Sequence, residues 1–212
     1  MSVEGRLIVS VIGRKGGAGK TTTAFNLAGA IEEHGRAVCL LDLDPQESLS
    51  RLFEPGDGAA HVKAWGAIAE RHSVRGDTTQ WLAGALPKEG LVIIDTPPHL
   101  GAIMDAAIAC ADRVVLPTRL IRPDIDSLRD TLGRCPGAPL IVPNAVMVRN
   151  GTHRDMLTEL RRVYGTLVWG KEIPQSVVVE EALNAGQPVA RYRRRSAPAA
   201  AYRALATEVL GA

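Results

Sequence analysis

The sequence predicts an α/β fold, a doubly wound and mostly parallel sheet with helices on both faces. Short apolar runs alternate with helix-length segments along the 212 residues. Hydrophobic residues make up 46% of the chain but aromatic residues only 4%, so the core is built mainly from Ala, Val, Leu and Ile. Strands that are buried on both faces have this composition. Regular alternation of the two segment types is typical of right-handed βαβ units.

Five apolar runs are predicted to be strands. The second run ends directly before Asp42, and the third ends before Asp95. A Gly-rich loop and a helix from Lys20 to about His34 follow the first run, and Gly35 is a suitable end for that helix. Because ligands of open α/β sheets bind at the carboxyl ends of the strands, the loop and both aspartates are expected at one edge. The five strands are Leu7–Ile12, Ala37–Leu41, Leu91–Ile94, Arg113–Pro117 and Leu140–Val142.

Residues 53–90 have the least regular pattern. Gly56, Asp57 and Gly58 predict a loop, and Val62–Glu70 predicts a helix that carries Trp65. The chain has no internal repeat and no low-complexity linker. A single domain over residues 1–212 is therefore the simplest division.

Several classes of protein are disfavoured by composition. No apolar run is long enough to span a bilayer, and residues 1–6 lead straight into a strand rather than forming a signal peptide, so a cytoplasmic protein is expected. Cys39, Cys110 and Cys135 stand far apart without a C-x-x-C pair, which argues against disulfides and thiolate metal sites. We interpret them as small buried hydrophobic residues.

The glycine-rich loop predicts a phosphate site. It has the sequence K-G-G-A-G-K-T-T and lies between a predicted strand and a predicted helix, which is the context of a P-loop. Its glycines let successive backbone N–H groups turn toward phosphate oxygens, and the helix dipole adds to the attraction. Lys20 is expected to reach the β- and γ-phosphates, and the Thr21 hydroxyl to ligate Mg²⁺. The predicted nucleotide-binding residues here are Lys15, Gly16, Gly17, Ala18, Gly19, Lys20, Thr21 and Thr22.

Two further segments place carboxylates beside that loop. Asp42 and Asp44 belong to the sequence L-D-L-D-P-Q, and Asp95 opens D-T-P-P after an apolar strand. A carboxylate that holds a water molecule in line beside Mg²⁺ is sufficient for phosphoryl transfer. Taken alone, Asp44 would also fit a capping residue before a proline turn.

Together these motifs resemble the deviant Walker A motif and switch segments of the ParA/MinD ATPases. The resemblance implies that Lys15 contacts the phosphates of a partner subunit across an ATP-dependent sandwich homodimer. It also implies that Asp44 positions the attacking water, that Asp42 supports the switch and the metal, and that Asp95 reaches Mg²⁺ through a water. Lys15, Lys20 and Asp44 are thus the expected catalytic residues, and Thr21, Asp42 and Asp95 the expected metal site. The chain departs from the family at Arg14, where relatives usually carry Gln, Asn or Gly.

The resemblance also suggests where the adenine lies. Family members surround the base with loops after the fifth and sixth strands, which correspond to Asn144 and to the segment containing Pro174. Asn144 would then hydrogen-bond the base, and Pro174 would pack on its face. Asn144 fits equally well as a turn residue.

The C-terminal half of the chain is basic. Residues 1–112 carry 10 basic and 14 acidic side chains, and residues 113–212 carry 15 and 9. Two helices are expected there. One has Met156, Leu157, Leu160, Val163 and Tyr164 on a single face, and the last has Tyr202, Leu205, Ala206, Val209 and Leu210. The last helix would leave Arg203 facing outward.

An arginine-rich run precedes that last helix. A solvated surface loop is one interpretation of Arg191, Arg193, Arg194 and Arg195. The other is non-specific binding of double-stranded DNA through phosphate contacts, which the resemblance favours and to which Arg203 would contribute. Partition ATPases bind DNA in this way as ATP dimers.

The preferred function is therefore a partition or positioning ATPase that uses ATP and Mg²⁺. It would associate with the nucleoid when ATP-bound and hydrolyse ATP, slowly by itself, when a ParB-like or other cargo-binding protein stimulates it, to segregate plasmid or chromosomal DNA. The short plasmid-type proteins without an N-terminal helix-turn-helix resemble this chain best. A MinD-like ATPase of membrane or protein cargo is an alternative, although the last helix is not basic and amphipathic and no membrane partner is expected. A metabolic ATP-dependent synthetase on the same fold and a nucleotide-gated binding module are further alternatives.

Overall fold

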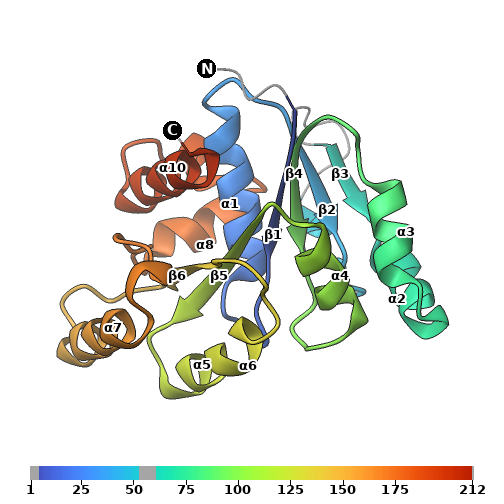
Figure 1. Ribbon diagram of the computed structural model, residues 1–212. Coiled ribbons are helices and arrows are strands. Elements are labelled where there is room, and N and C mark those ends of the chain that lie inside the picture. The colour runs from blue at the N-terminus through green and yellow to red at the C-terminus, as the bar shows by residue number, and fades with distance from the viewer. Residues whose placement is uncertain (1–4, 53–60, 212) are drawn as a thin grey trace.

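The computed structural model describes residues 5–52 and 61–211, which form a sheet covered by helices on both faces (Figure 1). The sheet has six strands in the order β3-β2-β4-β1-β5-β6, and every neighbouring pair is parallel. The predicted α/β fold is confirmed, and the described sheet is wholly rather than mostly parallel. The strands are β1 (Arg6–Val11), β2 (Val38–Asp42), β3 (His61–Ala64), β4 (Gly90–Asp95), β5 (Arg113–Arg119) and β6 (Leu140–Asn144).

All five predicted strands are present, but the helix expected over Val62–Glu70 is correct only from Gly66 onward. Residues 61–64 are the edge strand β3, and the helix α2 (Gly66–Arg75) begins after Trp65. The strand exists because it pairs with β2 along Cys39–Asp42 and because Trp65 N donates to Asp42 O at 2.8 Å. Those bonds join distant segments, so the local sequence does not reveal them. The predicted loop at residues 56–58 lies outside the described residues. So do residues 1–4 of the segment 1–6, which was predicted not to form a signal peptide.

The two faces of the sheet bury alternate side chains of each strand. In β4, Ile93 joins one core, whereas Val92 and Ile94 join the other. The first face is covered by α1 (Lys20–Glu32), α8 (Val177–Asn184), α9 (Val189–Tyr192) and α10 (Ala197–Leu210). The opposite face packs against α2, α3 (Thr78–Ala85), α4 (Ala102–Cys110), α5 (Arg122–Asp126), α6 (Leu128–Leu132) and α7 (Gly151–Tyr164). Two short 3-10 turns complete the description, η1 (Ser50–Leu52) and η2 (Gly165–Leu167).

The predicted helix faces are correct except at Val163. In α10 the residues Tyr202, Leu205 and Val209 are buried as expected. In α7, Leu157 and Leu160 are buried, but Val163 is 54% exposed because it borders an open groove between α5 and α7. Cys39, Cys110 and Cys135 carry free thiols and are half-buried rather than fully buried.

The topology gathers the predicted site at one edge of the sheet. Strand β1 lies between β4 and β5, where the chain crosses from one half of the sheet to the other. Val11, Asp42 and Asp95 stand in register on three adjacent strands. The loop after β1 therefore leaves the sheet beside both aspartates, at the position where open α/β sheets bind ligands. Within the described ranges, no helix combines the length and apolarity needed to cross a bilayer.

Candidate functional site

The phosphate loop links β1 to the first turn of α1. Gly19 stands just before the helix with φ of +95°, a left-handed conformation that glycine adopts without strain. A Cβ on Gly19 would lie 2.1 Å from Nδ2 of Asn144, so a larger residue would also collide with that side chain. The first N–H groups of α1 have no partner within the helix and form the base of an anion site.

The two lysines of the loop are in contrasting environments. Lys20 is buried, and its Nζ donates to the Lys15 carbonyl oxygen at 3.2 Å. Burial lowers the pKa of Lys20, while Asp95, Asp44 and Asp124 act in the opposite direction. The side chain of Lys15 is exposed. Lys20 thus belongs to the interior of the site, whereas Lys15 is accessible from outside it.

Asp95 and Thr21 form the buried side of the site. The Thr21 hydroxyl donates to Asp95 Oδ2 at 2.7 Å, and Asp95 Oδ1 is buried without a hydrogen-bond partner among the described residues. The pKa of Asp95 is raised to about 7, mainly by burial and in part by the nearby Asp42, against the opposing effects of the Thr21 hydrogen bond and Lys20. The carboxylates of Asp42 and Asp95, side by side at the end of the sheet, are therefore not fully neutralised by the nearby cationic side chains.

This arrangement fits a Mg²⁺ ion that accompanies a nucleotide. In the described parts of the chain, no three His, Cys, Asp or Glu side chains cluster closely enough to hold a metal by themselves. Mg²⁺ at nucleotide sites uses one or two protein ligands and completes its shell with phosphate oxygens and waters. Thr21 and the unpartnered Asp95 oxygen match that mode, and the cation would neutralise charge on the transferred phosphoryl group.

Asp42 organises the segment that follows β2. Its Oδ1 accepts from Asp44 N at 3.1 Å, and its Oδ2 accepts from both the backbone N and the hydroxyl of Ser50, at 2.9 and 3.0 Å. Asp44 Oδ1 in turn accepts from Gln46 N at 2.9 Å. Asp42 is fully buried, whereas Asp44 is partly exposed. The first carboxylate therefore fixes the loop, and the second is left accessible at the site.

Asn144 and Pro174 occupy the neighbouring edge. Asn144 is buried at the end of β6, and its Nδ2 donates to the Ala18 carbonyl oxygen at 2.9 Å. Pro174 is partly exposed and lies in a parallel bridge with Val146. Asn144 thus supports the phosphate loop directly, and its predicted hydrogen bond to adenine stays a prediction.

Arg119 and Asp124 also border the phosphate loop, although neither was predicted from the sequence to be a site residue. Arg119 ends β5, and its guanidinium donates to both carboxylate oxygens of the buried Asp124, at 2.9 and 3.1 Å. Arg14, the departure from the family pattern, forms an ion pair with Asp130 of α6. The signal that would have pointed to Arg119 is a cation at the carboxyl end of the strand next to β1.

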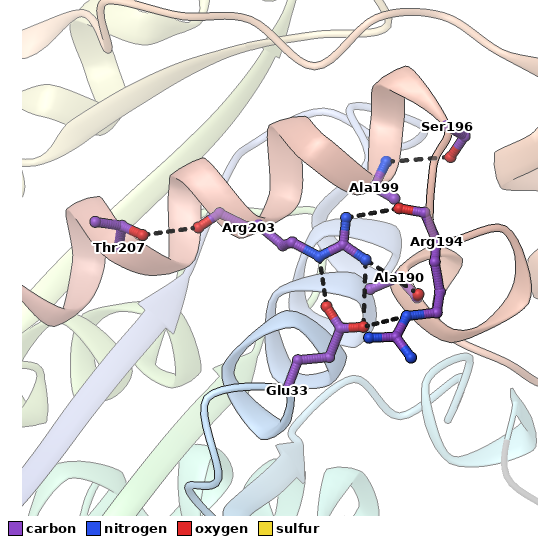
Figure 2. A network of polar contacts seen from close by, with 7 residues as sticks. All are labelled: Glu33, Ala190, Arg194, Ser196, Ala199, Arg203 and Thr207. Carbon is purple, nitrogen blue, oxygen red and sulfur yellow. Dashed lines mark hydrogen bonds and ion pairs between the residues drawn. The ribbon is translucent and has the colours of Figure 1, made fainter.

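The predicted DNA-binding arginines lie on a surface turn at residues 191–195, which we call the arginine turn. Arg191, Arg193, Arg194 and Arg195 are all exposed. Among the residues that the structure describes, their ion pairs are loose ones, from Arg193 to Glu181 at 3.8 Å and from Arg194 to Glu33 at 3.7 Å. This turn joins α9 to α10 and packs near the end of α1 (Figure 2). Its donors are largely free to bind an external anion.

Arg203 differs from these four residues because its guanidinium bridges parts of the protein (Figure 2). It donates to both carboxylate oxygens of Glu33, at 2.5 and 3.2 Å, and to the carbonyl oxygens of Arg194 and Ala190, at 2.7 and 3.3 Å. Four of the five N–H donors of an arginine are thus used internally. The sequence predicted an outward-facing Arg203. The side chain is partly exposed, but its guanidinium is held in a polar network at the surface rather than free.

Comparison with known proteins places this geometry in a family. The model of the CobQ/CobB/MinD/ParA nucleotide binding domain matches residues 9–189. The chain belongs to the ParA/MinD family of ATPases. The matched range contains the phosphate loop, all three aspartates, Asn144 and Pro174, and it ends just before the arginine turn.

Proteins similar to this chain include partition and positioning proteins. The chain is 30% identical to the chromosome-partitioning ATPase Soj of Thermus thermophilus, over 95% of this chain and 94% of that protein. It is 36% identical to the maintenance of carboxysome distribution protein A of Gloeobacter kilaueensis, over 72% of this chain and 63% of that protein. A ParA/MinD-type partition or positioning ATPase is the class of protein that these matches support.

Solved structures of several nucleotide-binding proteins share the fold. Apo McdA of Cyanothece superimposes with a TM-score of 0.79 at 20% identity, covering 97% of this chain and 100% of the other. The Mg-ADP complex of MinD from Pyrococcus horikoshii gives 0.69 at 20%, covering 96% of both chains. Cobyrinic acid a,c-diamide synthase of Mycobacterium smegmatis with ADP and magnesium gives 0.75 at 24%, covering 97% and 94%. At these identities the likeness establishes the fold alone.

Proposed function

We propose that this chain is a partition or positioning ATPase that binds Mg²⁺–ATP, forms a nucleotide-sandwich homodimer and binds DNA non-specifically in that state. The loop N–H groups, Lys20 and Thr21 would hold the phosphates and the ion, with Asp42 and Asp95 on the metal side. Asp44 would orient the attacking water, because it is the accessible carboxylate of the pair. Catalysis would rest on positioning and charge stabilisation, as in other phosphoryl transfers.

The exposed side chain of Lys15 is the main observation that supports the proposed dimer. A lysine within a phosphate loop is normally used by its own site, and we assign that role to Lys20 here. Within the described residues, Lys15 contributes its carbonyl oxygen to the internal network, through the bond from Lys20, and no bond of its ammonium group. Its ammonium is therefore available to the phosphates of a second copy that faces this edge of the sheet.

The arginine turn would supply the DNA contacts. Arginine forks suit phosphate oxygens, and Arg191, Arg193, Arg194 and Arg195 present their side chains to solvent. The turn packs near Glu33 at the far end of α1, about 20 Å from the phosphate loop for a 13-residue helix. A dimer joined at its phosphate loops would leave both turns free. Nucleoid association in the cytoplasm would follow from ATP binding.

A cargo-bound partner would complete the cycle by stimulating hydrolysis, in the role of a ParB-like protein. Similarity to a chromosome-partitioning ATPase and to a carboxysome distribution protein supports segregation of a chromosome or of a protein assembly as the task. The synthetase alternative rests on likeness of fold alone.

DNA binding at several salt concentrations tests the proposal directly. A random-sequence duplex is titrated with protein in the presence of ATP, ADP or no nucleotide, and mass is followed by light scattering. We expect binding only with ATP, together with a dimer, and a steep loss of affinity with salt. Lys15→Ala should abolish the dimer and DNA binding while ATP binding by the monomer persists.

Lys88→Ala is a matched control. Lys88 is exposed and precedes β4, at the amino end of the strands and opposite the phosphate loop. This variant should behave as wild type, since it removes one positive charge from elsewhere on the surface. A wild-type chain that binds ATP but no DNA in any state would refute the nucleoid function, and an ATP dimer that survives Lys15→Ala would refute the role of that lysine.

A further inference from the structure

Arg119 and Asp124 form an ion pair beside the phosphate loop that the nucleotide assignments above leave unused. Strand β5 runs parallel to β1, and it continues four residues beyond Val115, the last partner of β1. This extension carries Arg119 past the start of the phosphate loop. Its Nη1 lies 3.5 Å from the point where a Cβ on Gly17 would stand, which places the guanidinium directly over the loop.

Asp124 holds the guanidinium in a fixed orientation. Its side chain is only 3% exposed, and it accepts from Nε and Nη2 of Arg119 in a bidentate pair. The hydrogen bonds to Asp124 raise the pKa of Arg119, so the guanidinium stays protonated. The remaining nitrogen, Nη1, makes no hydrogen bond to the described residues and is the one nearest the loop. Arg119 is therefore preorganised, and both N–H donors of its Nη1 are unused within the described part of the chain.

The surroundings place these donors at the end of the site where the outer phosphates belong. Asp124 acts electrostatically on Lys20, the lysine expected at the β- and γ-phosphates. A small cavity of about 10 Å³ between the loop and α5–α6 is lined by Gly13, Lys15 and Asp124, among others. Arg119 is 34% exposed, so the guanidinium borders the open site rather than the core.

We propose that Arg119 is a further phosphate-binding cation of this site, held by Asp124 and directed at the terminal phosphate of a bound nucleoside triphosphate. The inference rests on the proposed nucleotide-binding function and adds a residue to it. Two N–H donors aimed at the γ-phosphate would strengthen binding of ATP over ADP, because only ATP carries that group. Asp124 is the positioning residue, since it acts only through the guanidinium.

Isothermal titration calorimetry with AMPPNP and with ADP, both with Mg²⁺, measures this preference. We expect Arg119→Gln to weaken AMPPNP binding about tenfold, the usual effect of losing a hydrogen bond to a charged group. ADP affinity should change little. An unchanged ratio of AMPPNP to ADP affinity would overturn the proposal. A purely structural role of Arg119 would give that result, because it would weaken the binding of both nucleotides equally.

A double variant separates the missing cation from the carboxylate that it leaves behind. Arg119→Gln alone leaves the buried carboxylate of Asp124 as an unpaired charge. The double variant Arg119→Gln with Asp124→Asn removes both charges together. The preference for AMPPNP should be lost in both proteins. Recovery of the wild-type ratio in the double variant would overturn the proposal, because the defect would then come from the orphaned carboxylate.

Arg134→Gln is the matched control. Arg134 forms a comparable pair with Asp105 on the surface, without contact to the loop. It should leave both affinities unchanged, and thermal melting without nucleotide shows whether each variant is folded. A wild-type chain that binds neither nucleotide would refute the proposed function itself, whereas normal wild-type binding with an unaltered ratio in Arg119→Gln would refute this inference only.

Discussion

At the scale of single residues, Glu32 and Glu33 carry the same charge in opposite environments. Glu32 Oε1 is buried and lacks a hydrogen-bond partner among the described residues. Burial raises the pKa of Glu32, and Arg191 only partly offsets that effect. The hydrogen bond from Arg203 lowers the pKa of Glu33. Adjacent carboxylates at the end of α1 therefore have opposite effects on folding at neutral pH.

Glu32→Gln should stabilise the protein at neutral pH. The folded state holds the protonated form of Glu32 more strongly than the unfolded chain does, because its pKa is raised. Stability is thus lost as the pH rises from 4.5, the ordinary value, through the raised pKa. The melting temperature of the variant should exceed that of wild type at pH 7 and match it more closely at pH 4. A lower melting temperature at pH 7 would show that the attraction to Arg191 dominates.

Glu33→Gln should have the opposite sign. It replaces the carboxylate that accepts two bonds from Arg203, and an ion pair of this partly exposed kind is worth about 1 kcal/mol. A loss of roughly 2–4 °C in melting temperature is expected at pH 7. Because the pKa of Glu33 is lowered, the difference should persist above pH 4.5 and vanish as the pH falls through the lowered value. A difference that stays constant down to pH 2 would contradict this account.

At the scale of elements, the contact between α1 and the segment before α9 depends on a glycine. A Cβ on Gly29 would lie 2.2 Å from Cβ of Pro188 and 2.4 Å from its Cγ. Pro188 cannot retreat, since the next residue, Val189, donates its N–H to the buried Asn26 side chain at 2.7 Å. Gly29 thus lets a helix that begins at the phosphate loop approach the segment that leads to the arginine turn.

Gly29→Ala should therefore destabilise the protein although alanine favours helices. Overpacking of this kind costs about 1–3 kcal/mol, which exceeds the gain of about 1 kcal/mol in helix propensity. Denaturant unfolding measures the difference. Gly84→Ala in α3 is the matched control, because none of the described residues lies within 4 Å of its added Cβ. The control should stabilise by up to about 1 kcal/mol, and equal gains in both variants would refute the close contact.

Elements with a strong local pattern were predictable from the sequence. Runs such as Leu91–Ile94 are apolar and end on a polar residue, so their position and their shared edge followed from periodicity and topology. Strand β3 was not predictable, because its four residues become a strand only by pairing with β2. The predicted burial of Val163 was wrong for a related reason. Helical spacing identifies the apolar face of a helix but not the groove that leaves part of that face open to solvent.

The candidate site divides in the same way. The loop and the three aspartates were found because each lies in a contiguous motif next to a strand. Arg119 was missed because its place over Gly17 depends on the strand order, which brings β5 next to β1. Arg203 was assigned outward from helical spacing alone, and its network with Glu33 joins residues that are far apart in the sequence.

At the scale of the whole molecule, the phosphate loop and the arginine turn pack at opposite ends of α1. Lys20 begins the helix, and Glu33, just after its end, contacts Arg194 and Arg203. The distance of about 20 Å between these ends means that one copy can use both surfaces at once. A dimer would thus carry two separate arginine turns, and DNA affinity would depend on phosphate contacts from both.

The salt dependence of DNA binding can distinguish contact arginines from structural ones. Each phosphate contact contributes about 0.9 to the slope of log K against log salt, so Arg195→Ala should reduce the slope of an ATP dimer by about 2 without changing its melting temperature. Arg203→Ala should instead lower the melting temperature and leave the slope unchanged, because its donors serve Glu33 and two carbonyl oxygens. Arg75→Ala, at the exposed end of α2, should change neither quantity. If Arg203→Ala reduces the slope as much as Arg195→Ala does, Arg203 binds phosphate and the network around Glu33 opens when DNA is bound.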